Sequence, residues 1–123
     1  GYGLSYTSVQ YGAVQLNTNA LSKDQKLQVK ITVTNTGKYA GEEVVQLYMQ
    51  DVVASIVRPV RELKAFEKVL LKPGESREIT FTLDARDLSF YNDNLELVAE
   101  PGTFHLYIGG NSQATQKASF TLL

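Results

Sequence analysis

The chain has 123 residues, of which 43% are hydrophobic and 20% are charged. This composition fits one globular domain and argues against a disordered, fibrous or membrane protein, since no apolar run approaches the roughly 18 residues of a spanning helix. The formal net charge is -1 and no basic block is present, so we expect no nucleic-acid partner. Since a long apolar run is missing, we expect no membrane partner either. The sequence contains no cysteine, which excludes disulfides, thiolate catalysis and Cys-ligated zinc.

The predicted elements are strands, because hydrophobic and polar residues alternate as they do in half-buried antiparallel strands. A first strand is expected near Tyr6 to Leu16, where Gly12 marks a bulge that shifts the alternation. Five segments then alternate clearly. The residues predicted to face the core are, in chain order, Leu27, Val29, Ile31 and Val33, then Val45, Leu47 and Met49, then Ile79, Phe81 and Leu83, then Phe104, Leu106 and Ile108, and finally Ala118, Phe120 and Leu122.

A weaker strand is expected at Leu63 to Leu71, between the second and third of these segments. Its alternation slips between Ala65 and Phe66. A bulge at that point, or two short strands, would explain the slip.

Turn signals separate the strands. Pro73-Gly74 and Pro101-Gly102 suit the central positions of a type II turn, where proline presets φ and glycine accepts a positive φ. Residues 84–88 are expected to form a single helical turn, with Asp84 accepting hydrogen bonds from backbone N–H groups.

About seven short strands at regular spacing predict an all-β fold, an immunoglobulin-like or fibronectin type III-like antiparallel β-sandwich. The Cys-Trp-Cys core of antibody domains is missing, so the fibronectin type III-like variant fits better. We expect residues 1–123 to form a single domain.

The sequence offers weak candidates for catalysis and metal binding. His105 is the only histidine, and the alternation places it on the solvent face; a structural role is favoured over a general base or metal ligand, because no second ligand lies near it in sequence. The carboxylates fall in turns or at strand ends, where solvated caps are the default interpretation. The paired candidates for glycoside hydrolysis are Glu42 with Glu43, Asp84 with Asp87, and Asp93 with Glu96.

Cofactor and metal sites are not indicated either. The chain has no phosphate-binding glycine loop and no nucleophile motif of the G-x-S-x-G type. Residues 92–94 supply oxygen ligands for calcium but lack the spacing of an EF-hand. We therefore assign no catalytic residue, no metal ligand and no cofactor.

Tyr48 and Tyr107 form a candidate contact site. Both are expected on outward faces, and in an immunoglobulin-type order their strands are neighbours in one sheet. Three interpretations stay open: a cross-strand pair that stabilises the sheet face, a contact with another domain, and an aromatic platform that stacks on a sugar ring.

The segment Asp51 to Glu62 is unusually apolar for a connection. In one interpretation its valines and isoleucine fold back over the edge of the sandwich. In another it is a docking surface for a neighbouring domain, and direct substrate contact is a third. The candidate docking residues are Asp51, Val52, Val53, Ile56, Val57 and Arg58, of which the two charged ones are available for an ion pair or backbone contacts.

These blocks together resemble the C-terminal fibronectin III-like domain of family 3 glycoside hydrolases, and most of all that of bacterial periplasmic β-glucosidases. The resemblance covers essentially the whole chain, with Ala65 standing where glycine is common. The blocks that carry it are GYGLSYT at residues 1–7, VTNTGKYAGEEVVQLYMQD at 33–51, VASIVRPVRELKAFEKVLLKPGES at 53–76, DLSFY at 87–91 and AEPGTFHLYIG at 99–109.

The resemblance implies a parent enzyme with a barrel domain that carries an Asp nucleophile, then an α/β domain that often carries the acid/base residue, and then this module. Neither catalytic segment lies in these 123 residues. Residues 1–7 would be the end of the linker from the preceding catalytic domain. The implied parent reaction is the hydrolysis of terminal, non-reducing β-D-glucosyl residues, with β-xylosides as a variant.

The expected role is therefore a non-catalytic accessory domain that packs against the catalytic domains of the same polypeptide and stabilises them. The resemblance also implies a periplasmic or secreted parent and leaves a homodimer of the parent open. Two other functions are retained as alternatives: a carbohydrate-binding module that uses exposed tyrosines, and a structural or adhesion immunoglobulin-like domain.

Overall fold

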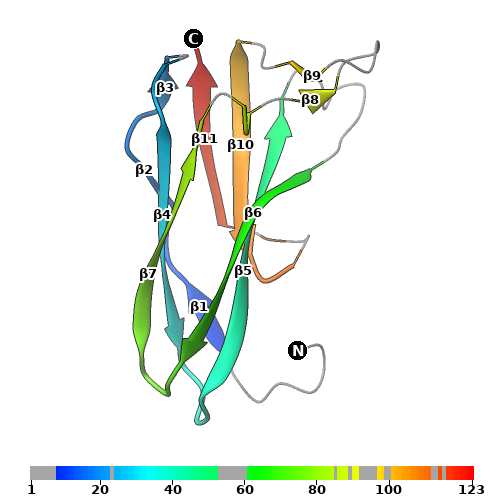
Figure 1. Ribbon diagram of the computed structural model, residues 1–123. Coiled ribbons are helices and arrows are strands. Elements are labelled where there is room, and N and C mark those ends of the chain that lie inside the picture. The colour runs from blue at the N-terminus through cyan, green and yellow to red at the C-terminus, as the bar shows by residue number, and fades with distance from the viewer. Residues whose placement is uncertain are drawn as a thin grey trace.

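The computed structural model describes residues 8–22, 24–52, 61–84, 86–88, 90–91, 97–98, 101–111, 114 and 116–123. Two β-sheets lie against each other (Figure 1). In the first sheet, β4 (Leu27–Asn35) is flanked on one side by β1 (Val9–Tyr11) and β2 (Gln15–Leu16) and on the other by β7 (Ser76–Leu83). The second sheet has the order β3 (Ala20–Leu21), β11 (Gln116–Leu122), β10 (Gly102–Gly109), β5 (Gly41–Asp51) and β6 (Glu62–Leu71). The short strands β8 (Phe90–Tyr91) and β9 (Leu97–Val98) pair with each other.

The predicted all-β sandwich is confirmed, and the described residues contain no helix. Seven of the strands, β1, β4, β5, β6, β7, β10 and β11, are three residues or longer, which matches the expected number. One pairing departs from the expected antiparallel arrangement: β3 runs parallel to β11, with Ala20 opposite Thr121. The sequence could not indicate β3, because two residues are too few to show alternation.

The core lies between the sheets and is made by the alternating residues. Every predicted inward residue of β4, β5, β7 and β10 is buried, and in β11 Phe120 and Leu122 are buried whereas Ala118 is half-buried. The rings of Phe104 and Phe120 stack across β10 and β11, with their centroids 5.3 Å apart. Side chains from both sheets therefore form one continuous apolar cluster.

Both predicted bulges are present. Tyr11 lies opposite Val33 and Gln15 opposite Lys30, so one extra residue is accommodated between β1 and β2 around Gly12. In β6 the predicted position, between Ala65 and Phe66, is slightly wrong, since the extra residue is Lys64. Each bulge adds one residue to the strand and so shifts the alternation by one position. The hydrophobic residues that follow the bulge can then face the core.

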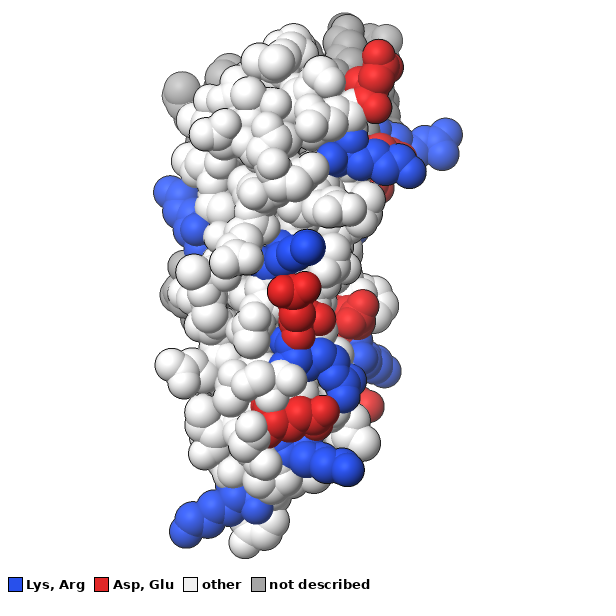
Figure 2. Space-filling view, turned by 90° about the vertical axis from the view of Figure 1, so that its left-hand side faces the viewer, with Lys and Arg blue, Asp and Glu red and all other residues white. Residues whose placement is uncertain are grey.

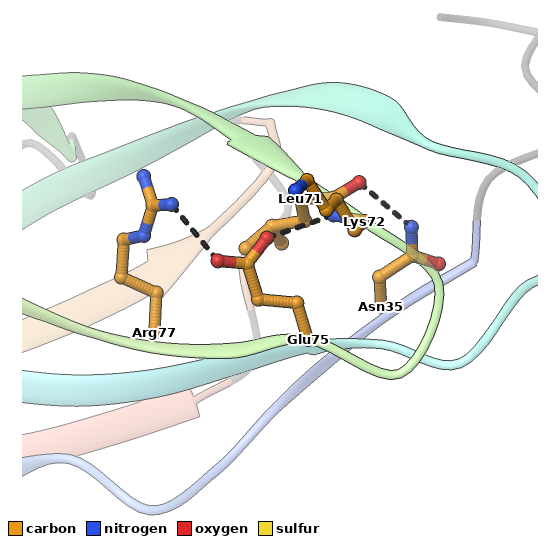
Figure 3. Close-up of polar contacts among 5 residues, drawn as sticks. All are labelled: Asn35, Leu71, Lys72, Glu75 and Arg77. Carbon is orange, nitrogen blue, oxygen red and sulfur yellow. Dashed lines mark hydrogen bonds and ion pairs between the residues drawn. The ribbon is translucent and has the colours of Figure 1, made fainter.

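The β6–β7 turn and the β4–β5 connection lie at the same end of the sandwich (Figure 1). The predicted Pro73-Gly74 turn is confirmed: Gly74 has a φ of 78°, and the Glu75 N–H donates to the Lys72 carbonyl at 2.9 Å. Asn35 joins this turn to β4, because its side-chain amide donates to the Leu71 carbonyl at 3.1 Å. Figure 3 shows this contact beside the carboxylate of Glu75, which accepts from the Lys72 N–H at 2.8 Å and from Arg77 at 3.0 Å.

The other two turn predictions have mixed outcomes. Asp84 accepts from the backbone N–H groups of Arg86 and Asp87 at 3.0 and 3.1 Å, as expected, although the described residues there form a turn and not a helix. Gly102 is not the centre of a type II turn: its φ is 146°, far from the value of about 80° that such a turn needs, and it is the first residue of β10. No helix in the described part of the chain is long and apolar enough to cross a membrane.

Candidate functional site

Tyr48 and Tyr107 lie directly opposite each other on the outer face of the second sheet, as predicted. Their surroundings differ from the expectation, because Tyr107 is only 8% exposed. The guanidinium carbon of Arg61 lies 3.6 Å from the centre of its ring, and the Lys117 ammonium lies 5.8 Å from it. Tyr107 is thus covered by cations from the residue that precedes β6 and from β11.

Hydrogen bonds fix both tyrosine hydroxyls. The Tyr107 hydroxyl donates to the Gln50 side chain at 3.1 Å, and the Tyr48 hydroxyl donates to the Gln46 side chain. The Arg61 guanidinium also donates to the Ala114 carbonyl at 2.9 Å, a second contact that holds it beside Tyr107. Stacking on a sugar needs an exposed ring face, and Arg61 occupies one face of Tyr107. This geometry favours the structural pair over the sugar platform.

His105 lies next to this group on the same outer face. Its Nδ1 is 2.7 Å from the Ser119 hydroxyl oxygen, and its ring meets the Tyr107 ring edge-on at 6.3 Å. Partial burial, and secondly the positive charge of Lys117, lower the pKa of the imidazole below its ordinary value. The histidine is therefore only partly exposed, more enclosed than the alternation suggested.

The predicted docking segment is described only at its start. Asp51 is the last residue of β5 and lies opposite Phe104, and the Val52 N–H donates to the Thr103 carbonyl at 3.1 Å. Both residues are half-buried. Val53, Ile56, Val57 and Arg58 lie outside the described residues. Docking through this segment stays a prediction.

An exposed apolar stripe on β6, which sequence reasoning missed, is the clearest unexplained feature of the surface. Leu63, Phe66 and Leu70 all point outward from this strand, with exposed fractions of 49%, 60% and 61%. They lie opposite outward residues of β5, with Leu63 facing Tyr48. We call these three residues the β6 stripe. The sequence contained the signal for this stripe. Val69 and Leu71 face the core, and if the alternation of faces is continued from them toward the start of the strand, Leu70 and Phe66 fall on the outer face.

A cleft of about 340 Å³ lies where β1 meets the ends of β10 and β11. It is lined by Val9, Tyr11, Ile108, Gly109, Gly110, Asn111, Ala114 and Gln116. Beside it, the Tyr11 hydroxyl donates to Glu43 at 2.5 Å, and burial, followed by this contact, raises the pKa of the tyrosine well above its ordinary value. Glycoside hydrolysis needs two flanking carboxyl groups, and none of the described lining residues is acidic.

Among the residues that the structure describes, the carboxylates considered for catalysis do not come together in one site. Glu43 bonds Tyr11, whereas Asp84 and Asp87 cap their own turn, with the Asp84 N–H donating to Asp87 at 3.0 Å. Backbone N–H donation, mainly from Asp87, lowers the pKa of Asp84. No group of three metal-ligating side chains occurs among the residues that the structure describes. Asp93, Glu96 and the calcium candidate at residues 92–94 fall outside that part of the chain.

Comparison with known proteins shows that the chain is similar to a part of several glycosidases. It is 46% identical to a periplasmic β-glucosidase from Salmonella typhimurium, over 100% of this chain and 16% of that protein. It is 40% identical to a putative β-xylosidase from Formosa agariphila, over 99% of this chain and 16% of that protein.

Solved structures give the same result. A β-glucosidase from Erythrobacter marinus matches with a TM-score of 0.88 and 41% identity, over 99% of this chain and 16% of that one. A β-glucosidase from Listeria innocua in complex with glucose matches with a TM-score of 0.85 and 42% identity, over 98% of this chain and 17% of that one. The chain thus spans less than a fifth of the length of these relatives.

The family itself follows from the model that matches residues 43–112, more than half of the chain, which describes a fibronectin type III-like domain. The match covers β6, β7 and β10 and most of β5, the strands that build much of the sandwich. The chain belongs to the fibronectin type III-like domain family.

Proposed function

We propose that this chain is a non-catalytic accessory domain of a longer family 3 glycoside hydrolase, which hydrolyses terminal, non-reducing β-D-glucosyl residues. The observation that carries the proposal is the alignment of the whole chain with a small part of a periplasmic β-glucosidase, at 46% identity over 16% of that protein. β-Xylosides are the variant substrate, since a putative β-xylosidase is similar at 40% identity.

The proposed role is to pack against the catalytic domains of the same polypeptide and stabilise them. A sandwich with its own closed core can act as a rigid body in such a contact, because docking requires no refolding. Polar side chains that could take part in binding or catalysis make contacts within the domain instead: Arg61 covers Tyr107, and Asp84 and Asp87 cap a turn. These contacts support a role in packing more than a role in chemistry.

We also propose that the parent enzyme is exported. The Salmonella typhimurium relative is a periplasmic β-glucosidase, which supports a periplasmic or secreted location for the longer polypeptide. Fractionation of cells that express that polypeptide would test the location, and retention in the cytoplasm would contradict it.

The proposal is tested by comparing three proteins: the longer polypeptide, the same polypeptide without residues 1–123, and residues 1–123 alone. We expect the first to release p-nitrophenol from p-nitrophenyl β-D-glucoside, and the third to release none. The truncated form should have a lower Tm and a lower kcat/KM, because the catalytic domains lose a stabilising contact.

Two results would overturn different parts of the proposal. A longer polypeptide that hydrolyses neither the β-D-glucoside nor the β-D-xyloside would remove the glycosidase assignment. A truncated form with full activity and an unchanged Tm would leave the enzyme but remove the accessory role.

A further inference from the structure

We propose that the β6 stripe, formed by Leu63, Phe66 and Leu70, is the surface through which this chain docks onto the rest of its own polypeptide. The inference rests on the proposed function in one respect, namely that the chain is one domain of a longer protein. It names a face of the sandwich that differs from the apolar connection after β5, to which the sequence pointed.

The exposed apolar side chains are concentrated and not scattered. Five large hydrophobic residues are exposed among those described, and three of them form the β6 stripe. Single exposed hydrophobics are ordinary on a soluble protein, whereas a contiguous set with a polar rim marks an interaction surface. Glu42 and Gln46 lie opposite Leu70 and Phe66 on β5 and supply such a rim, and Lys68 lies on the same outer face between Phe66 and Leu70.

The outer face of the first sheet is polar, in contrast to the β6 stripe. Thr32 and Thr80 and their neighbours Gln28 and Thr82 are all exposed there, on β4 and β7. Figure 2 views the molecule from the side on which β4 and β7 lie in Figure 1, and acidic and basic side chains are interspersed there in a band through the centre and right of the view. The apolar residues of β6 are therefore a local feature, not a consequence of overall composition.

The arrangement of β6 indicates how a partner would meet it. This strand ends the five-stranded sheet, so its outer edge offers backbone groups to which another strand could pair. Glu67 lies opposite the buried Val45, on the core-facing side, yet it is exposed, and Lys64 forms a bulge in the same strand. A charge and a bulge of this kind discourage strand addition at an edge. The partner is expected to lie on the face of β6 and bury side chains, not to extend the sheet.

The partner that covers the β6 stripe is the rest of the same polypeptide and not a second copy of this chain. The reason is that the relatives are much longer than this one domain. Residues 1–123 correspond to 16–17% of the relatives of known sequence or structure described above. A covalently linked surface is present at millimolar effective concentration, which favours it over a separate molecule at cellular concentration. The complementary face is predicted to present apolar side chains of its own.

Thiol labelling tests this directly, because the chain contains no cysteine. The F66C variant is made in the longer polypeptide and in residues 1–123 alone, and its rate of modification by a maleimide is compared between the two. The isolated chain is usable because the whole core cluster is contained in it. We expect labelling in the longer polypeptide to be at least about tenfold slower, which corresponds to about 1.4 kcal/mol of docking free energy.

The matched control is T80C, on the exposed outer face of β7, which should label at the same rate in both proteins. The longer polypeptide without either substitution gives the background from any cysteine outside this chain. A second stripe variant, L70C, covers the case in which F66C is poorly folded. The readout does not depend on glycosidase activity, so the inference and the proposed function can fail separately.

Equal labelling of F66C and L70C in both proteins would overturn the inference. Slow labelling in the isolated chain that becomes fast on dilution would also overturn it, because it would make the β6 stripe a contact between copies. A supporting result is a lower Tm for the L63S/F66S/L70S variant of the longer polypeptide, with no change in residues 1–123 alone. The control substitution is Leu123→Ser, since that residue is also 61% exposed but follows β11, which β10 and β5 separate from β6.

Discussion

Asn35 shows how a single side chain organises one end of the sandwich. It is fully buried, its amide donates to the carbonyls of Tyr39 and Leu71, and its side-chain oxygen accepts from the Gly37 N–H at 2.9 Å. Buried polar groups persist in native structures when they are hydrogen-bonded. Asn35 therefore fastens the β4–β5 connection to the last residue of β6, and these two parts of the chain are otherwise far apart in sequence.

Replacing Asn35 by Ala is expected to cost roughly 1–3 kcal/mol of unfolding free energy, because the Leu71 carbonyl loses its side-chain partner in a buried site and the Gly37 N–H loses its own in a partly buried one. The measurement is urea unfolding of residues 1–123. The control is Thr34→Ala, one residue earlier in β4, whose hydroxyl contacts Ser76 on the exposed face at 2.7 Å. Equal losses for the two variants would contradict the role given to Asn35.

The titration of His105 makes a second prediction at the residue scale. Burial, and secondly Lys117, lower the imidazole pKa in the folded state, so the unfolded chain binds more protons below about pH 6.5. Stability should fall as pH drops through about 6.5, the ordinary histidine pKa, and this slope should be weaker in His105→Gln. Because the chain has one histidine, its NMR signal reports the pKa without assignment work.

The same experiment identifies the cause. Lys117→Gln removes a positive charge beside the imidazole and should raise its titration midpoint toward the ordinary value. Arg86→Gln, in the turn after β7, serves as the charge-matched control and should leave the midpoint unchanged. A midpoint in the unsubstituted chain at or above the ordinary histidine value would refute the prediction.

At the scale of the elements, the β6–β7 turn depends on one glycine. Gly74 has a φ of 78° and nothing lies within 4 Å of the position that a Cβ would occupy, so a substitution there acts through the backbone conformation alone. Gly74→Ala is expected to cost about 1–2 kcal/mol, since residues with a Cβ disfavour this region. Gly74→Asn should cost less, because asparagine tolerates a positive φ. Urea unfolding of both variants gives the comparison, and similar losses for Asn and Ala would argue against it.

The elements also show what the sequence could and could not predict. Alternation was sufficient for β4, where every second residue from Leu27 to Val33 points inward, because the signal for a half-buried strand is contained in the strand itself. The burial of Tyr107 was not predictable in this way, because Arg61 covers it and the two residues are 46 positions apart in sequence. The β6 stripe was missed because the slip near Ala65 hid the phase of the strand.

The segment Asp51 to Glu62 shows a second kind of information that the sequence alone does not contain. Its apolar residues were noticed as an anomaly in a connection, and the described part of it, Asp51 and Val52, is half-buried. Its function depends on what the rest of the polypeptide presents to it. Such a contact leaves no periodic signal in the domain's own sequence, so composition alone could suggest docking but not identify the face that docks.

Considered as a whole molecule, the sandwich is closed by residues from both sheets. The buried cluster draws on β4 and β7 from one sheet and on β5, β10 and β11 from the other, so neither sheet has a core without its partner. We therefore expect residues 1–123 to unfold in one cooperative transition. Far-UV circular dichroism and tyrosine fluorescence, which is usable because the chain has no tryptophan, should give coincident urea curves. Curves that separate would show that the sheets unfold independently.

Two phenylalanines distinguish the interior of this molecule from the surface proposed for docking. Phe104 is 1% exposed and stacks on Phe120, so Phe104→Ala is expected to cost about 3–5 kcal/mol in the isolated chain. Phe66 is 60% exposed, and Phe66→Ala should stay within about 0.5 kcal/mol there. In the longer polypeptide Phe66→Ala should become destabilising, because the ring is then buried against another domain. A large loss for Phe66→Ala in the isolated chain would mean that the ring supports this sandwich itself, and its exposure would no longer indicate a partner.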